Sequence, residues 1–149
     1  MAKTAFIFPG QGAQYVGMAK DFCDKYEECR KIIDEADELM DFDLKAIMFE
    51  ENELINKTEY TQAAMLAAEC CILKAVELKG IKADITAGLS LGEYAALVAS
   101  GALDFADAMK LVRKRGIYME NEVPAGKGTM AGRFGRIDLE QNQQCHGKW

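Results

Sequence analysis

The chain has little of what marks several common classes of protein. Its 149 residues include only two prolines, one tryptophan and one histidine, and no apolar run approaches the length that crosses a membrane. The first apolar run ends at Pro9, which is too soon for the apolar region of a signal peptide. We therefore expect neither a leader nor an anchor, and a cytoplasmic protein that binds no membrane.

The chain also has no C-x-x-C motif and no predominance of basic residues. None of the five cysteines forms a C-x-x-C pair, which favours reduced, buried thiols over disulfides or a zinc site. The 18 lysine and arginine residues are interspersed among 24 aspartate and glutamate residues, and the formal net charge is −6. Because phosphate binding needs clustered positive charge, we expect no nucleic-acid partner. We also expect no metal site.

The chain does have enough apolar sequence for one core. Hydrophobic residues make up 50% of it, so we expect a single domain or a piece of a larger one. Apolar runs at 3–8 and 83–87 predict short buried strands. Apolar residues at three- and four-residue steps predict five helices, at 22–40, 43–49, 61–79, 91–100 and 105–119. Strands alternating with helices predict an α/β protein.

A G-x-S-x-G pattern stands where the second predicted strand turns into a helix. Ser90 is at its centre, and Gly88 and Gly92 occupy the positions two before and two after it. A tight strand-turn-helix corner with small residues at these two places lifts a serine hydroxyl out of the sheet. Ser90 is therefore the best candidate nucleophile for acyl transfer. The backbone N–H of Leu91 would lie at a helix N-terminus, where partial positive charge can stabilise an oxyanion.

The same segment has a purely structural interpretation. Ser90 and Glu93 have the spacing of a capping box, S-x-x-E, which any helix can use to satisfy its first N–H groups. From this segment alone, capping and catalysis are both open.

Further segments of the chain carry a family resemblance. They read FIFPGQGAQ at 6–14, TEYTQ at 58–62, GLSLGEYAAL at 88–97, RKRG at 113–116 and VPAGKGTMA at 123–131. In this order and spacing, the chain resembles the malonyl-CoA:acyl-carrier-protein transacylases of fatty acid synthesis. The match runs from about Lys3 to Ala131 and covers the first part of a domain about twice as long.

The resemblance implies a partial fold. We expect an α/β-hydrolase-like acyltransferase subdomain, with a short parallel sheet flanked by helices, while the family's small ferredoxin-like subdomain is missing. Residues 1–131 would be the N-terminal part of the acyltransferase domain. Residues 132–149 have few apolar residues and no strand alternation. We interpret them as an unmatched tail, expect them to be disordered, and infer a truncated chain.

The resemblance also implies roles for four residues. Ser90 would attack malonyl-CoA, the substrate, and pass the malonyl group to the phosphopantetheine thiol of acyl carrier protein, without a cofactor. The backbone N–H groups of Gln11 and Leu91 would form the oxyanion hole. Arg115 would hold the malonyl carboxylate, since a guanidinium offers two parallel N–H···O bonds. The alternative for Arg115 is a solvated helix charge like those expected of its neighbours Arg113 and Lys114.

The general base of the family is not found in the matched segment. In that family it is a downstream histidine, whereas the only histidine here, His146, lies in the unmatched tail. We do not expect it to serve Ser90. Two other functions therefore stay open: a non-catalytic fragment that binds an acyl group or a partner, and a general serine esterase. An esterase needs an acid and a histidine after the nucleophile, and it leaves Arg115 and the Gln11 loop unexplained.

Overall fold

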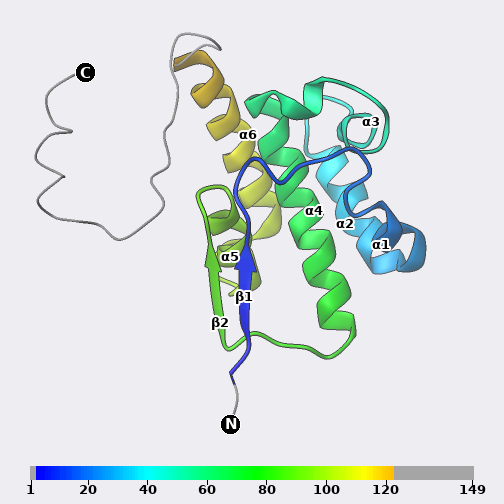
Figure 1. Ribbon diagram of the computed structural model, residues 1–149, viewed down its shortest axis with the longest axis vertical. Coiled ribbons are helices and arrows are strands. Elements are labelled where there is room, and N and C mark those ends of the chain that lie inside the picture. The colour runs from blue at the N-terminus through cyan, green and yellow to red at the C-terminus, as the bar shows by residue number, and fades with distance from the viewer. Residues whose placement is uncertain (1–2, 123–149) are drawn as a thin grey trace, which may run out of the picture.

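A computed structural model of the protein describes residues 3–122. Within this range, helices pack against one face of two short parallel strands (Figure 1). The elements, in chain order, are β1 (Ala5–Phe8), α1 (Lys20–Lys25), α2 (Glu27–Glu38), α3 (Leu44–Phe49), the 3₁₀ helix η1 (Leu54–Asn56), α4 (Thr58–Leu78), β2 (Ile85–Gly88), α5 (Gly92–Ala99) and α6 (Phe105–Glu122). The predicted α/β class and parallel sheet are confirmed.

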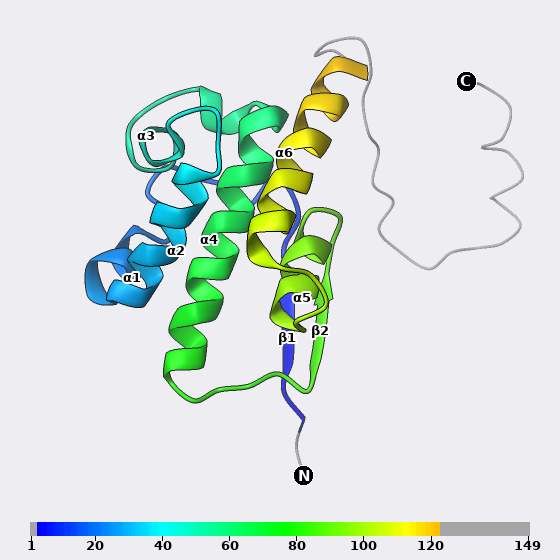
Figure 2. The same cartoon turned by 180° about the vertical axis from the view of Figure 1, so that it is seen from behind.

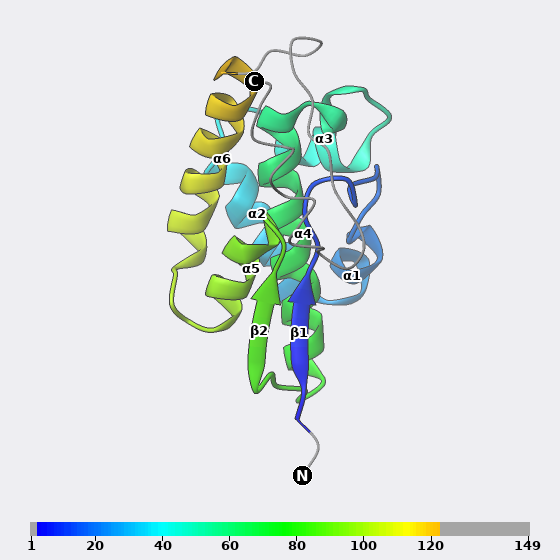
Figure 3. The ribbon, with the colours of Figure 1, turned by 60° about the vertical axis from the view of Figure 1, so that its left-hand side comes forward.

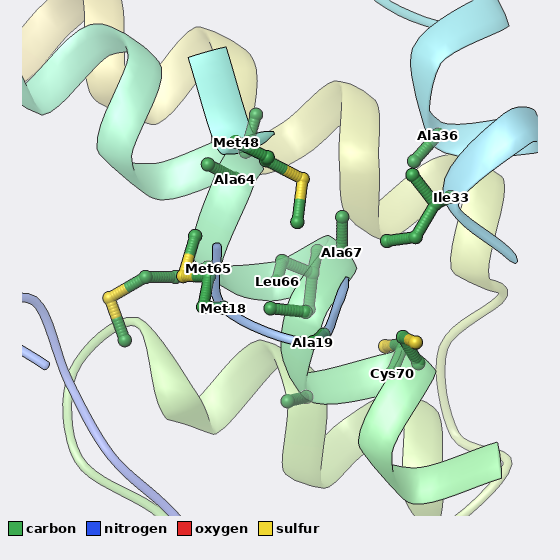
Figure 4. Packing of buried hydrophobic residues seen from close by; sticks show 14 of the residues in the cluster. Met18, Ala19, Ile33, Ala36, Met48, Ala64, Met65, Leu66, Ala67 and Cys70 are labelled. Carbon is green, nitrogen blue, oxygen red and sulfur yellow. The ribbon is translucent and has the colours of Figure 1, made fainter. Parts of the chain in front are cut away.

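Helix α4 is the centre of the helical layer. It lies between α2 and α6 (Figure 2), and most of its side chains are buried, as its nearly uninterrupted apolar sequence predicts. Figure 4 shows Ile33 of α2 and Met48 of α3 pointing toward the α4 residues around Leu66. No helix of the described range is long and apolar enough to cross a bilayer.

The predicted helix at 22–40 is wrong as a single element. Two helices, α1 and α2, are separated at Tyr26, whose backbone is extended (φ −126°, ψ 122°). The break is stabilised locally, because Arg30 donates a hydrogen bond of 3.1 Å to the Cys23 carbonyl near the end of α1. Apolar periodicity continues across the break, so the pattern alone could not reveal it.

Aspartate carboxylates accept hydrogen bonds from backbone N–H groups in the first turns of α3 and α6. The Asp43 carboxylate accepts a 2.8 Å hydrogen bond from the Ala46 N–H at the start of α3. Asp104 accepts one of 2.9 Å from Ala106 at the start of α6. Each of these bonds satisfies a backbone donor that the helix itself leaves free.

The cysteines within residues 3–122 are free and buried, which confirms the predicted thiols. Cys23 and Cys71 approach each other at 3.7 Å between their sulfur atoms, and Cys29 donates to the Cys71 carbonyl. Burial raises the pKa of all three thiols and of Cys70, to about 12 for the last. They are therefore packing residues. Cys145 lies outside the described residues.

Among residues 3–122, helices cover one face of the sheet and no element covers the other. The parallel register pairs Ala5 with Ile85 and Phe8 with Gly88, so alternate side chains point to the same face. Phe8 points into the core, whereas Ile7 is 78% exposed and Ile85 is 56% exposed. In Figure 3 the helices lie behind the strands. Parallel strands normally have both faces buried, so this apolar face is an incomplete part of the fold.

A second incomplete region lies beside β1. A cavity of about 320 Å³ is lined by β1 and α4 and by no residue of β2. Glu69 of α4 lines it, and neither of its carboxyl oxygens has a hydrogen-bond partner among the described residues. Burial raises the pKa of Glu69 to about 8, because desolvation favours the neutral carboxylic acid over the carboxylate. An unpartnered buried carboxyl is destabilising, which again marks this edge as unfinished.

The uncovered sheet face predicts that the isolated chain self-associates. Replacing Ile7 and Ile85 by lysine puts two charges on this face and should shift sedimentation velocity profiles toward smaller species. The matched control is Leu97→Lys with Leu111→Lys, which adds the same charge at half-exposed helix positions. A wild-type chain that is a soluble monomer with one cooperative unfolding transition would contradict this account.

Candidate active site

Ser90 lies in the short turn that connects β2 to α5. Its side chain is exposed, and its backbone is left-handed, with φ of 55°. A non-glycine residue rarely adopts this conformation, which costs on the order of 1 kcal/mol. The predicted strand-turn-helix corner is therefore present, and the serine at its tip is held in a strained backbone.

Two glycines make this corner possible. A side chain at Gly88 would overlap the carbonyl of Gly92, and one at Gly92 would overlap the carbonyl of Phe8 at the end of β1. The turn also bonds directly to β1, because Leu89 donates a 3.1 Å hydrogen bond to the Phe8 carbonyl. Close backbone approach at both positions explains why the corner requires glycine two residues before and two after Ser90.

The capping-box interpretation of Ser90 is not realised. The residue that caps α5 is Leu91, and the helix has no side-chain cap. The Ser90 hydroxyl instead accepts a hydrogen bond of 3.0 Å from the guanidinium of Arg115. The side chain thus faces a cation from α6 rather than the start of its own helix.

Arg115 is not a freely solvated charge. It is half-buried on α6, and its second guanidinium nitrogen donates a 2.7 Å hydrogen bond to the side-chain oxygen of Gln62. The guanidinium also lies 5.9 Å from the ring centroid of Tyr94 on α5. Arg115 therefore connects α6 with α4 and with the serine turn.

Gln62 extends the network to the loop after β1. It is 1% exposed, and its amide nitrogen lies 3.3 Å from the side-chain oxygen of Gln11. Gln11 in turn donates a 3.1 Å hydrogen bond to the Thr58 hydroxyl at the start of α4. The sequence prediction assigned Gln62 no role. The available signal was an amide residue directly before the long apolar run of this helix, since a buried amide requires partners.

The backbone N–H groups of Gln11 and Leu91 belong to the two segments that this hydrogen-bond network joins. Within residues 3–122, neither donates a hydrogen bond to another residue of that range. Leu91 itself is fully buried, and its N–H stands at the start of α5, where the helix dipole is positive. The serine, the arginine and both amides thus belong to one corner of the molecule, formed by segments distant in sequence.

The remaining predicted features lie outside the described residues. These are His146, the VPAGKGTMA segment at 123–131, and the boundary predicted after Ala131. The described range contains no histidine. A base for Ser90 is therefore not identified within residues 3–122.

Known proteins with similar sequences carry a consistent name. Malonyl CoA-acyl carrier protein transacylase from Bacillus subtilis strain 168 is 44% identical over 149 residues, which is 99% of this chain and 47% of the relative. The chain thus spans about half the length of the curated relative it matches.

Solved structures agree with this likeness. MCAT from Streptococcus pneumoniae superposes with a TM-score of 0.80 and 53% identity, over 83% of this chain and 40% of that chain. A malonyl-transacylase solved in complex with a type II PKS acyl-carrier protein superposes with a TM-score of 0.78 and 39% identity, over 84% and 41% of the two chains.

A family model assigns the whole arrangement to one class. The model described as acyl transferase domain matches residues 5–148 and so includes both strands, the serine turn and the arginine helix. The sequence, the parallel sheet with its serine corner, and the solved relatives agree that this chain belongs to the acyl transferase domain family.

Proposed function

We propose that this chain supplies the acyl-accepting half of an enzyme that transfers a malonyl group from malonyl-CoA to acyl carrier protein. The observation that carries the proposal is the 3.0 Å hydrogen bond between the Arg115 guanidinium and the Ser90 hydroxyl. A serine on a strained corner with a fixed guanidinium beside it suits an acyl group that ends in a carboxylate. The similar proteins, malonyl transacylases of acyl carrier protein, support the same substrates.

Ser90 acts first as the nucleophile. Its Oγ attacks the thioester carbonyl of malonyl-CoA, the C–S bond breaks, and the CoA sulfur leaves with the proton that the hydroxyl gives up. In the second half-reaction, the phosphopantetheine thiol of acyl carrier protein attacks the seryl ester. Its proton returns to Ser90 and the malonyl group departs on the carrier. No cofactor is consumed in either step.

Arg115 selects the acyl group. The guanidinium carries a permanent positive charge and can form two parallel hydrogen bonds with the free carboxylate of malonyl. Gln62 holds one of its nitrogens at 2.7 Å, so the side chain is already oriented before substrate binds. An acetyl group has no carboxylate and gains nothing from this contact.

Gln11 and Leu91 would stabilise the tetrahedral intermediate. Their N–H groups have no partner within residues 3–122 and can both donate to the oxyanion. The bonds from the Gln11 side chain to Gln62 and Thr58 would hold that loop in place. Loss of one such donor typically slows acyl transfer by about 10²–10³-fold.

A non-catalytic fragment is the second candidate. It is favoured by one observation, the lack of any histidine in the described range that could accept the Ser90 proton. The chain also covers only 47% of the Bacillus subtilis relative.

For the enzyme, we propose that a second half, of the kind that completes the Bacillus subtilis relative, supplies the base. We also propose that the complete enzyme acts in the cytoplasm.

Ser90 should be the residue that takes the malonyl group. Incubation of the chain with malonyl-CoA should add the mass of one malonyl group at Ser90, observed by intact and peptide mass spectrometry. We expect slow labelling of the chain alone, because no base is positioned. Labelling should accelerate in a chimera that joins residues 1–131 to the second half of the Bacillus subtilis relative.

The matched control is Ser100→Ala, which removes an exposed hydroxyl on the other end of α5. It should leave labelling unchanged, whereas Ser90→Ala should abolish it. Labelling that persists in the Ser90→Ala chimera would refute the assignment. A chimera that is folded yet never labels would favour the non-catalytic fragment.

Arg115 should control the choice between acyl groups. In the same chimera, Arg115→Ala should reduce kcat/KM for malonyl transfer by about 10²-fold, the effect of losing a charge-assisted pair of hydrogen bonds. Acetyl transfer should be spared or improved. Initial-rate kinetics with malonyl-CoA and with acetyl-CoA as substrates measure the two kcat/KM values.

Lys114→Ala is the control, since it removes a neighbouring exposed charge on the same helix. It should change neither reaction. Equal losses of malonyl and acetyl transfer in Arg115→Ala would rule out carboxylate recognition and indicate a structural role.

A further inference from the structure

Arg113, two residues before Arg115, makes more contacts than an exposed charged residue on a helix would make. Its side chain is 14% exposed. It donates to both carboxylate oxygens of Asp41, at 2.7 and 3.1 Å, and to the backbone carbonyl of Glu59 at 2.9 Å. Its guanidinium also lies over the rings of Phe42 and Tyr60, at 4.8 and 5.5 Å from their centroids.

These contacts tie α6 to the first turn of α4. The Glu59 carboxylate is a further partner of Arg113, at 3.4 Å. Beside it, Gly116 packs directly on the same turn, because a Cβ there would lie 2.9 Å from the Thr58 carbonyl oxygen. Glu120 adds a third connection, since its carboxylate accepts a 3.1 Å bond from the Thr58 N–H. The position of α6 along α4 is thereby defined.

The first turns of α4 also support the serine site. Thr58 bonds to the Gln11 side chain, and Gln62, one turn after Glu59, bonds to Arg115. Positions 113 and 115 are about 200° apart around α6, so one arginine can hold the helix while the other reaches the serine. A shift of α6 relative to α4 would move Arg115 away from both Gln62 and Ser90.

We propose that Arg113 is a positioning residue that fixes α6 against α4 so that the Arg115 guanidinium stands at the Ser90 hydroxyl. Its importance for catalysis rests on the function proposed above, but the geometric claim does not. Lysine could not replace it, because the planar fork of arginine serves a carboxylate, a carbonyl and two aromatic faces together, and an ammonium presents one point charge.

Arg113 and Asp41 stabilise each other's charged forms. The hydrogen bond from Arg113 holds the pKa of Asp41 below its usual range, and Asp41 in turn raises the pKa of Arg113. Asp41 is largely exposed, so the bond that it forms can be removed without opening the core. This provides a mild variant for the test.

The test measures the Arg115 contact through a thiol at the serine position. In the Ser90→Cys variant of the full chain, the guanidinium should favour the thiolate and speed alkylation by iodoacetamide at pH 7. Peptide mass spectrometry follows residue 90 separately from each of the five native cysteines. Adding Arg113→Lys should slow this alkylation by about tenfold at pH 7, the effect of a one-unit change in thiol pKa.

The shape of the pH–rate profile separates positioning from loss of fold. Arg113→Lys should move the midpoint of the profile to higher pH and leave the alkylation rate at high pH unchanged. Arg115→Gln should have the same two effects. Asp41→Asn should move it in the same direction by less, and it keeps the test valid if Arg113→Lys fails to fold. Lys114→Gln is the charge control and should move nothing. Because no malonyl transfer is measured, failure of the proposed function would not affect the result.

A midpoint that stays at the Ser90→Cys value in both Arg113→Lys and Asp41→Asn would overturn the proposal. An equal shift in Lys114→Gln would also overturn it, since the effect would then be one of general charge. A change in the high-pH rate without a shifted midpoint would indicate altered exposure and would likewise refute positioning.

Discussion

The hydrogen bond between the Arg115 guanidinium and the Ser90 hydroxyl joins α6 to the turn between β2 and α5. The rest of the described structure supports the two ends of this bond. Glycines at 88 and 92 allow the serine corner to approach β1. On the other side, α4 holds Arg115 through Gln62 and holds α6 through its first turn. The geometry of the proposed site is a consequence of how closely the backbones of β1, the serine turn and the helices pack.

Much of this arrangement could be predicted from local sequence. The serine corner needs only a strand, a helix and two glycines within five residues, and the structure has all of them. The cap at Asp43 and the buried helix α4 follow from equally local rules. The resemblance to malonyl transacylases added the choice of Arg115, which no helix pattern distinguishes from Lys114.

The rest depends on contacts between distant segments. The break at Tyr26 lies inside an unbroken apolar period. Arg113 of α6 can be buried only because Asp41, from the loop between α2 and α3, pairs with it. The role of Gln62 depends on distant segments, because its hydrogen-bond partners come from α6 and from the Gln11 loop. The open sheet face has a different origin: its strands are as apolar as buried strands should be, yet no element within residues 3–122 covers Ile7.

A double-mutant cycle between Arg115 and Gln62 tests the central claim most directly. The two single alanine variants and the double variant are compared by kcat/KM for malonyl transfer in the chimera with the Bacillus subtilis half. If Gln62 acts by orienting Arg115, the losses should be non-additive, with a coupling energy of about 0.5–3 kcal/mol, and Gln62→Ala should have little further effect once Arg115 is gone. Strictly additive losses would contradict a shared network at Ser90.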